Sequence, residues 1–159
     1  MHRSTLLAML ALALVPASLS AQAGDADRRA VLAAVGRLFD GMRKGDSAMV
    51  RSAFHPNALL ATAVKHNGRP AVHVDTLDAF VSAVGTPHAD VWDERVRNAE
   101  VRIDGGLASV WTEYDFYAGG RFSHCGVDAF QLVRMGAEWR IIALADTRRQ
   151  TGCMEMGGS

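Results

Sequence analysis

The sequence predicts an α+β fold in which N-terminal helices pack on a strongly curved, mostly antiparallel sheet. Two observations lead to this fold class. After an apolar start, the first half of the chain carries hydrophobic residues at helical spacing, whereas the second half consists of long runs that alternate in polarity. Pairs of residues that contain glycine separate these runs, as expected for antiparallel hairpins.

The chain begins with a segment typical of a secretory signal peptide. His2 and Arg3 form a basic start, an apolar run follows from Leu6 to Val15, and Ala21-Gln22-Ala23 fits the small-residue pattern before a cleavage point. The apolar run is too short to cross a hydrocarbon core about 30 Å thick. We therefore predict that residues 1–23 are removed, and that the mature protein is exported to the periplasm or secreted, without a membrane partner.

The rest of the chain has the size of one domain. Roughly 136 residues follow the predicted cleavage point, which is enough to bury a sizeable core. We predict a domain over residues 24–150 and a C-terminal tail over residues 151–159. The 17 basic and 17 acidic residues balance, and no basic cluster contains interleaved aromatic residues, so nucleic acid is not an expected partner.

The helices are predicted from periodicity and capping residues. Apolar residues recur every three or four positions over 27–43, which indicates an amphipathic helix. Asp46 is suited to cap a short second helix that ends before Pro56, and a third helix is expected to follow Thr76 and to extend to Gly85. The expected strands cover residues 59–66, 71–74, 96–104, 107–118, 121–135 and 138–149.

The turn at Gly119-Gly120 sets an expected register for the long hairpin that it joins. If the turn has two residues, Asp115 lies opposite His124, and Trp111 lies opposite Asp128. These side chains would then share one face of the sheet. A single bulge would exchange the two faces, because neighbouring residues of a strand point in opposite directions.

Several short stretches resemble the nuclear transport factor 2-like, or SnoaL-like, superfamily. They are Phe54-His55-Pro56-Asn57-Ala58, the run from Gly105 to Trp111, and Trp139-Arg140-Ile141-Ile142. More narrowly, the run from Ser123 to Phe130, and Asp146-Thr147-Arg148-Arg149 with the later Cys153, resemble an exported group described as putative lumazine-binding proteins.

This resemblance implies a cone-shaped fold with a pocket between the helices and the concave face of the sheet. It also implies a homodimer that forms through the sheet. The superfamily contains ketosteroid isomerases, polyketide cyclases, scytalone dehydratase and epoxide hydrolases, together with members that have no established reaction. A shared fold therefore does not name an activity.

Three residues are candidates for acid-base chemistry. Asp115, if it lies opposite His124, would fix the tautomer of the histidine and raise its basicity. The alternative is an ion pair that only stabilises the hairpin. Asp128 lies in an apolar strand, where a carboxylate must be paired, protonated or open to a pocket. Its structural partner, if it has one, is expected to be Arg149 or Arg102.

Other residues are candidates for ligand binding or for a covalent link. The aromatic and imidazole side chains that we expect near a pocket are His55, Trp92, Trp111, Tyr114 and Phe130, although core packing is the alternative for Phe130. Cys125 and Cys153 are the only cysteines, and in an oxidising compartment they are candidates for a disulfide. The alternatives are a buried free thiol and an exposed one.

Metal and cofactor motifs are absent from the sequence. No P-loop, nucleophile elbow, dinucleotide fingerprint or metal-ligand spacing occurs, so no cofactor is expected. The leading prediction is a protein that binds a small, partly aromatic molecule. The alternatives are a cofactor-independent lyase, isomerase or cyclase, and a dimeric scaffold whose own side chains fill the cone.

Overall fold

The computed structural model describes the backbone of residues 17–153 and the side chains of residues 24–153. Most of the predicted signal peptide and most of the predicted tail lie outside these residues, so export stays a prediction. Within the described part of the chain, no helix is long and apolar enough to cross a membrane.

The helices start and stop where capping groups are available. Helix α1 (Ala17–Lys44) begins earlier than predicted, because the residues before position 27 also favour helix. Helix α2 (Ser47–Ala53) starts after Asp46, whose carboxylate accepts a hydrogen bond from the Met49 amide at 2.9 Å. Helix α3 (Leu77–Gly85) starts after Thr76, whose hydroxyl accepts one from the Ala79 amide at 3.1 Å.

The strands form one sheet of six in the order β2-β1-β6-β5-β4-β3. Strands β1 (Phe54–His66) and β2 (Arg69–Asp75) form the short hairpin, and β1 pairs in parallel with β6 (Glu138–Thr147). The remaining strands, β3 (Trp92–Asp104), β4 (Leu107–Ala118) and β5 (Arg121–Met135), complete the antiparallel meander. The predicted fold class is correct, but β1, β2 and β3 begin earlier than expected and β6 ends earlier, at Thr147.

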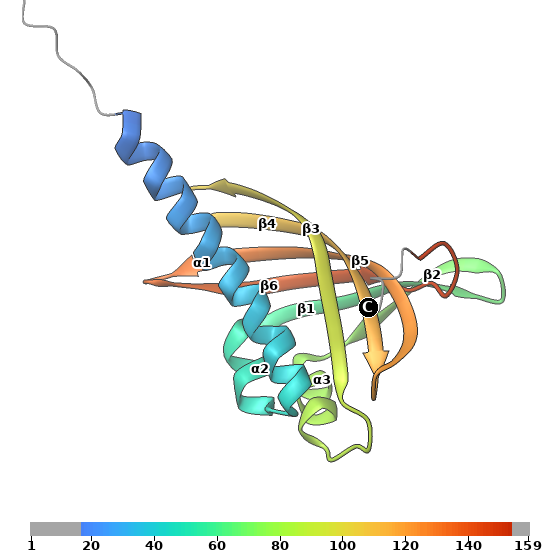
Figure 1. Cartoon of the computed structure of the whole chain (residues 1–159). Helices are drawn as coiled ribbons and strands as arrows, with labels where there is room; N and C mark the ends of the chain where they lie inside the picture. Colours follow the sequence, from blue (N-terminus) through green and yellow to red (C-terminus); the bar gives the residue numbers. More distant parts are fainter. Residues whose placement is uncertain (1–16, 154–159) are drawn as a thin grey trace, which may run out of the picture.

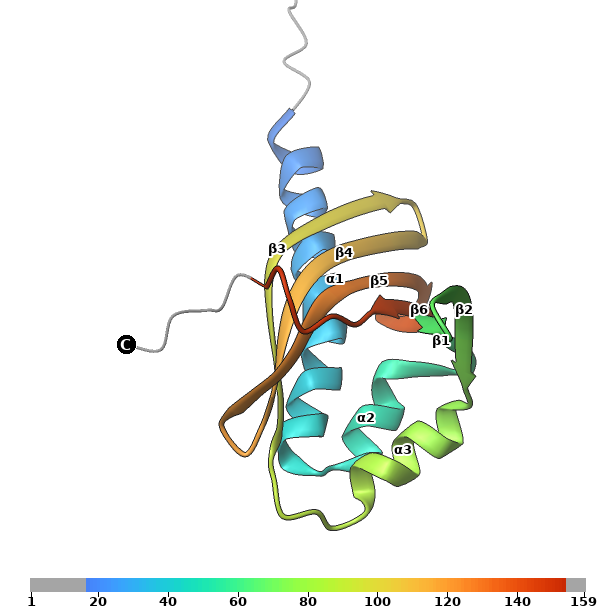
Figure 2. The same cartoon turned by 90° about the vertical axis from the view of Figure 1, so that its right-hand side faces the viewer.

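The sheet curves around the helices, which all lie on its concave side (Figure 1). Figure 2 shows α1 within the curve of the sheet, with α2 and α3 beside its lower half. The core lies between these layers: Val31, Leu38 and Phe39 of α1 are buried, and the Phe39 ring meets the Phe130 ring edge to face with centroids 6.1 Å apart. Beyond this packed core, a space remains between the helices and the concave face of the sheet.

A β-bulge overturns the register predicted for the long hairpin. Tyr117 pairs with Phe122, but Phe116 pairs with His124, so Ser123 is an extra residue in β5. Beyond the bulge, Asp115 lies opposite Cys125 instead of His124. The two-residue turn was counted correctly, but the extra residue shifts every later pair by one position.

The same shift separates residues that were expected to share a face. Trp111 lies opposite Ala129 instead of Asp128, and the partner of Asp128 is Thr112. His124 and Asp128 therefore face the helices together with Tyr114. Asp115 and Trp111 lie on the convex face.

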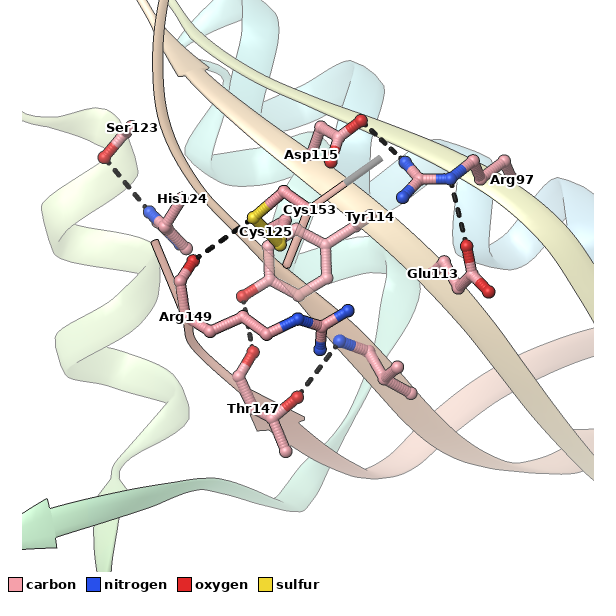
Figure 3. Close-up of a disulfide and its surroundings, with 11 residues drawn as sticks. Arg97, Glu113, Tyr114, Asp115, Ser123, His124, Cys125, Thr147, Arg149 and Cys153 are labelled. Carbon is pink, nitrogen blue, oxygen red and sulfur yellow. Dashed lines mark hydrogen bonds and ion pairs between the residues drawn. A yellow bond between two sulfur atoms is a disulfide. The ribbon is translucent and has the colours of Figure 1, made fainter. Parts of the chain in front are cut away.

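A disulfide ties the end of the described chain to the convex side of the sheet. Cys125 and Cys153 are bonded, with their Cα atoms 5.8 Å apart. Arg149 forms two backbone hydrogen bonds with Cys125, each of 2.9 Å, so the chain after β6 continues beside β5 (Figure 3). The predicted tail is thus held in place as far as Cys153.

We predict that loss of this disulfide destabilises the protein. The bond spans 28 residues, and closing a loop of that size contributes about 3.5 kcal/mol by limiting the unfolded chain. The variant Cys125→Ala/Cys153→Ala should lose about this much free energy of unfolding in urea titrations. Wild-type protein in a reducing agent is the control, and unchanged stability in both samples would refute the prediction.

Candidate functional site

A pocket of about 430 Å³ opens between the concave face of the sheet and helices α1 and α3. The helices line it with apolar side chains, whereas the sheet supplies its polar and most of its aromatic groups. Its lining residues are Leu38, Phe39, Met42, Leu60, Ala61, Thr62, Asp75, Ala79, Phe80, Ala83, Trp92, Glu94, Tyr114, Phe116, His124, Asp128, Leu144, Asp146 and Arg148.

A row of polar side chains crosses four neighbouring strands at this pocket. Thr62 of β1 pairs with Asp146 of β6, Asp146 pairs with Asp128 of β5, and Asp128 pairs with Thr112 of β4. Directly opposite residues of antiparallel strands have Cβ atoms about 5 Å apart, so two carboxylates placed in this way repel each other. The row is stable only if one of them is protonated or well paired.

Asp146 is the carboxylate that is paired. Its Oδ1 accepts a hydrogen bond from the Thr62 hydroxyl at 2.5 Å, and its Oδ2 accepts one from Arg148 Nε at 2.9 Å. The hydroxyl group of Tyr114 also lies 3.5 Å from Oδ2. These donors balance the charge of Asp146 within the row.

Asp128 is the carboxyl group without such donors. Its side chain is 2 % exposed, and no donor of the described residues hydrogen-bonds to Oδ2. Among the described residues, no hydrogen bond or ion pair joins it to Arg149 or Arg102, the expected partners. It instead shares a hydrogen bond with another acid, Glu94 of β3. Two carboxylates cannot form that bond unless one of them carries a proton.

The electrostatics of this pair favour a proton on Asp128. Burial, the charge of Glu94 and the hydrogen bond to Glu94 raise the pKa of Asp128 well above its usual range. Burial also raises the pKa of the half-buried Glu94 to about 7, although the hydrogen bond from Asp128 acts in the opposite direction. The pair therefore holds a proton at neutral pH.

Gly126 makes room for this arrangement. Any side chain on this residue would point into the space that Tyr114 fills, because an added Cβ would lie 2.6 Å from a Tyr114 ring atom and 1.8 Å from the Thr147 carbonyl oxygen. The Tyr114 hydroxyl donates to that same carbonyl at 2.9 Å (Figure 3). Burial and the neighbouring carboxylates raise the pKa of Tyr114, so its phenol stays protonated.

Aromatic rings form one wall of the pocket. His124 stacks on Phe116 with centroids 5.0 Å apart, and Trp92 meets Phe116 edge to face at 6.3 Å. Burial and the charge of Arg148 lower the pKa of His124, so its ring is neutral at pH 7. A neutral, stacked imidazole is suited to contact a flat ligand.

The structure brings together only part of the predicted site. Of the candidates for acid-base chemistry, His124 and Asp128 line the pocket, as do the expected ligand-binding residues Trp92 and Tyr114. Asp115 does not: it is buried on the convex side, where its Oδ2 accepts a hydrogen bond from Arg97 at 2.6 Å (Figure 3). The prediction that it supports His124 is wrong, because the bulge directs the two side chains to opposite faces.

The remaining predicted ligand-binding residues lie outside the pocket. Trp111 is 55 % exposed on the convex face, and Phe130 is fully buried in the core, where packing was its alternative role. His55 lies at the start of β1, and its Nδ1 accepts a hydrogen bond from the Asn57 amide at 3.2 Å. The disulfide between Cys125 and Cys153 is present.

Sequence reasoning did not identify Glu94 or Asp146 as pocket residues. Glu94 lies in a stretch before residue 96 that was read as irregular, so its direction could not be assigned. Asp146 and Arg148 stand in the stretch that resembles an exported group described as putative lumazine-binding proteins, and that resemblance was the available signal. Among the described residues, no group of three or more His, Cys, Asp or Glu side chains is arranged to hold a metal ion.

The helices, the curved sheet and the pocket between them define a nuclear transport factor 2-like protein. Residues 26–145 match the family described as putative lumazine-binding, and the chain belongs to that family. No curated protein matches the chain.

Solved structures share the fold at low sequence identity. An NTF2-like protein with a cystatin-like fold from Novosphingobium aromaticivorans has a TM-score of 0.68 at 14 % identity, over 89 % of this chain and 94 % of that one. A putative scytalone dehydratase from the same species has a TM-score of 0.66 at 11 % identity, over 82 % and 89 %. An NTF2-like protein of unknown function from Shewanella baltica has 0.61 at 15 %, over 80 % and 97 %. These similarities establish the fold alone.

We predict that Gly126→Ala strongly destabilises the protein. The added Cβ would lie 1.8 Å from a backbone oxygen, which cannot move aside without breaking strand pairing. The free energy of unfolding should fall by more than about 2 kcal/mol in urea titrations. Gly36→Ala is the control, because nothing lies within 4 Å of its added Cβ and alanine favours a helix. Equal effects of the two substitutions would contradict the proposed packing.

We also predict that stability falls as pH rises from about 4.5 to about 7. In this window the unfolded chain has lost the Glu94 proton but the folded chain retains it, so the folded state binds more protons and stability decreases with pH. Glu94→Gln should remove much of this decline and should be more stable than wild type at pH 8, on the order of 1–3 kcal/mol.

The measurement is the free energy of unfolding at several pH values. Glu100→Gln, which changes an exposed glutamate on the same strand, is the control and should retain the decline of the wild type. A decline in Glu94→Gln as large as that of the wild type would show that the Glu94 carboxyl group is not its source, whereas a smaller remaining decline is expected from the buried Asp128.

Proposed function

We propose that this protein binds a small, partly aromatic molecule in the pocket. The observation that carries this proposal is a cavity of about 430 Å³ with apolar and aromatic walls and a few polar groups gathered at one place. Small-molecule sites commonly have this composition and a volume of about 300–1,000 Å³. The family description, putative lumazine-binding, agrees with a flat heterocyclic ligand.

The unsatisfied oxygen of Asp128 supports the same proposal. Buried polar atoms in proteins almost always have a hydrogen-bond partner, and an exception calls for an explanation. Asp128 Oδ2 lacks a donor among the described residues, and its side chain lines the pocket. A donor group on a bound molecule would supply the missing bond.

The open pocket also argues against a scaffold whose own side chains fill the cone. The helices reach the sheet at Phe39 and Phe130, but beyond this contact the space between them is not packed. A protein without a ligand gains nothing from such a cavity, because its lining loses contacts that packing would provide.

Location and assembly are part of the proposal. A disulfide that ties Cys153 to Cys125 is typical of proteins in oxidising compartments, which supports export to the periplasm or secretion. The exposed Trp111 on the convex face supports a homodimer through the sheet.

A second candidate function is cofactor-independent acid-base catalysis. The hydrogen-bonded Glu94 and Asp128 favour it, because a carboxyl pair that exchanges a proton near pH 7 matches what a lyase or isomerase needs. The discriminating measurement is incorporation of deuterium from solvent at a C–H position of a bound carbonyl compound, followed by NMR, in wild type and in Glu94→Gln.

We predict that Ala79→Trp blocks ligand binding. Ala79 lines the pocket from the exposed side of α3, so an indole there should occlude the opening without disturbing the core. Affinity for flat mono- and bicyclic aromatic molecules, with lumazine among them, should fall by at least about tenfold, as measured by calorimetry.

Ser82→Trp is the matched control for this experiment. Ser82 is exposed on the same helix but does not line the pocket, so its substitution should leave affinity unchanged. The proposed function fails if none of these molecules binds to the wild type, or if Ala79→Trp binds them as well as wild type does.

A further inference from the structure

The polar groups of the pocket are mostly acidic. Glu94 comes from β3, Asp128 from β5 and Asp146 from β6, and Asp75 at the end of β2 adds a fourth carboxyl group. Arg148 is the one arginine or lysine among the lining residues, and it is already paired with Asp146 at 2.9 Å. The charge of Arg148 also favours the ionised forms of Glu94 and Asp128, but no cation of the described residues forms an ion pair with either of them.

The elements packed around Glu94 and Asp128 supply no further positive charge. Strand β4 supplies the protonated Tyr114, whose hydroxyl already donates to Thr147. Strand β5 supplies His124, which is neutral at pH 7. Helices α1 and α3 line the pocket with apolar side chains, so no cation comes from them.

Two further features of the pocket fit a positively charged group. The Asp128 side chain is 2 % exposed and lines the pocket, and its Oδ2 has no hydrogen-bond donor among the described residues. The same pocket is lined by Tyr114, Phe116 and Trp92, and the faces of aromatic rings attract cations through their quadrupoles. The lining therefore contains groups for both a charged hydrogen bond and a cation–π contact.

We propose that the pocket selects an aromatic molecule that carries a protonated amine, which binds at the Glu94 and Asp128 carboxyl pair while the ring lies along the aromatic wall. This inference rests on the proposed function and adds the charge of the ligand to it. Carboxylates hydrogen-bond strongly to ammonium groups, and the partly closed site increases that attraction.

Because Glu94 and Asp128 hold a proton between them, binding of a cation can also be followed through the release of that proton. An ammonium group replaces the proton that Glu94 and Asp128 share, so binding should release a proton to solvent. Because the pKa of Glu94 is about 7, affinity for a cation should increase as pH rises from 6 to 8. Asp146 and Arg148 balance each other, and the exposed carboxylate of Asp75 lies 3.3 Å from His73 Nε2.

Three probes with the same ring test the charge preference. Tryptamine carries an ammonium group that stays protonated below about pH 9, tryptophol has a neutral hydroxyl in its place, and indole-3-acetate carries a carboxylate. Calorimetry on the wild-type protein at pH 8 should give an affinity for tryptamine at least about tenfold above that for tryptophol, with indole-3-acetate weakest. A second titration at about pH 6.5, where Glu94 still holds most of its proton, in two buffers with different heats of ionisation, reports the proton that is released.

Variants identify the groups responsible. Glu94→Gln should reduce the preference for tryptamine over tryptophol to less than about threefold and should remove the proton release. Glu100→Gln, on the same strand but outside the pocket lining, should leave both unchanged. Binding that persists in Ala79→Trp would place the probe elsewhere and would overturn the inference.

The remaining outcomes separate this inference from the proposed function. If tryptophol or indole-3-acetate binds as tightly as tryptamine, the pocket binds aromatic molecules but the charge preference is refuted. If none of the three probes binds and the panel of flat molecules also fails, the proposed function is overturned together with the inference.

Discussion

The extra residue in β5 determines which chemistry the cone contains. Because Ser123 is inserted opposite the Phe116 and Tyr117 pair, His124 and Asp128 point toward the helices, and Cys125 points away from them. Without the bulge, the strand would present Cys125 to the pocket and would direct His124 and Asp128 to the convex side. The disulfide, the aromatic wall and the carboxyl row all depend on this one shift of register.

The row of carboxyl groups makes the fold less stable than an apolar row would, but it places acidic groups in the pocket. Asp146 of β6 lies directly opposite Asp128 of the neighbouring strand β5, and Glu94 adds a third acid from β3. An apolar row would pack better, since burying an acid that must stay protonated stabilises the fold less than burying a hydrocarbon. Functional sites in proteins often show this departure from the most stable choice, and here it coincides with the open end of the core.

The fold could be predicted from the sequence far better than the site. Periodicity and glycine turns located the β4 and β5 boundaries and the third helix, because these depend on local patterns that repeat over many residues. The partner of Asp115 could not be predicted in this way. A bulge is a single inserted residue with no distinct composition, and Ser123 gives no signal of one. Glu94 was missed because its role arises only when β3 brings it close to Asp128, two strands away.

Because the helices and the sheet supply different kinds of side chains to the pocket, its shape and its polarity can change separately. Size and shape are set by side chains of α1 and α3 such as Phe39 and Ala79, whereas polarity is set by strand residues such as Asp128. Substitutions on the helices could thus admit larger or smaller molecules without altering hydrogen bonding, and substitutions on the strands could alter charge selectivity at constant volume. The volume and the charge selectivity of such a pocket can therefore be varied independently, which makes it a suitable starting point for engineered binders.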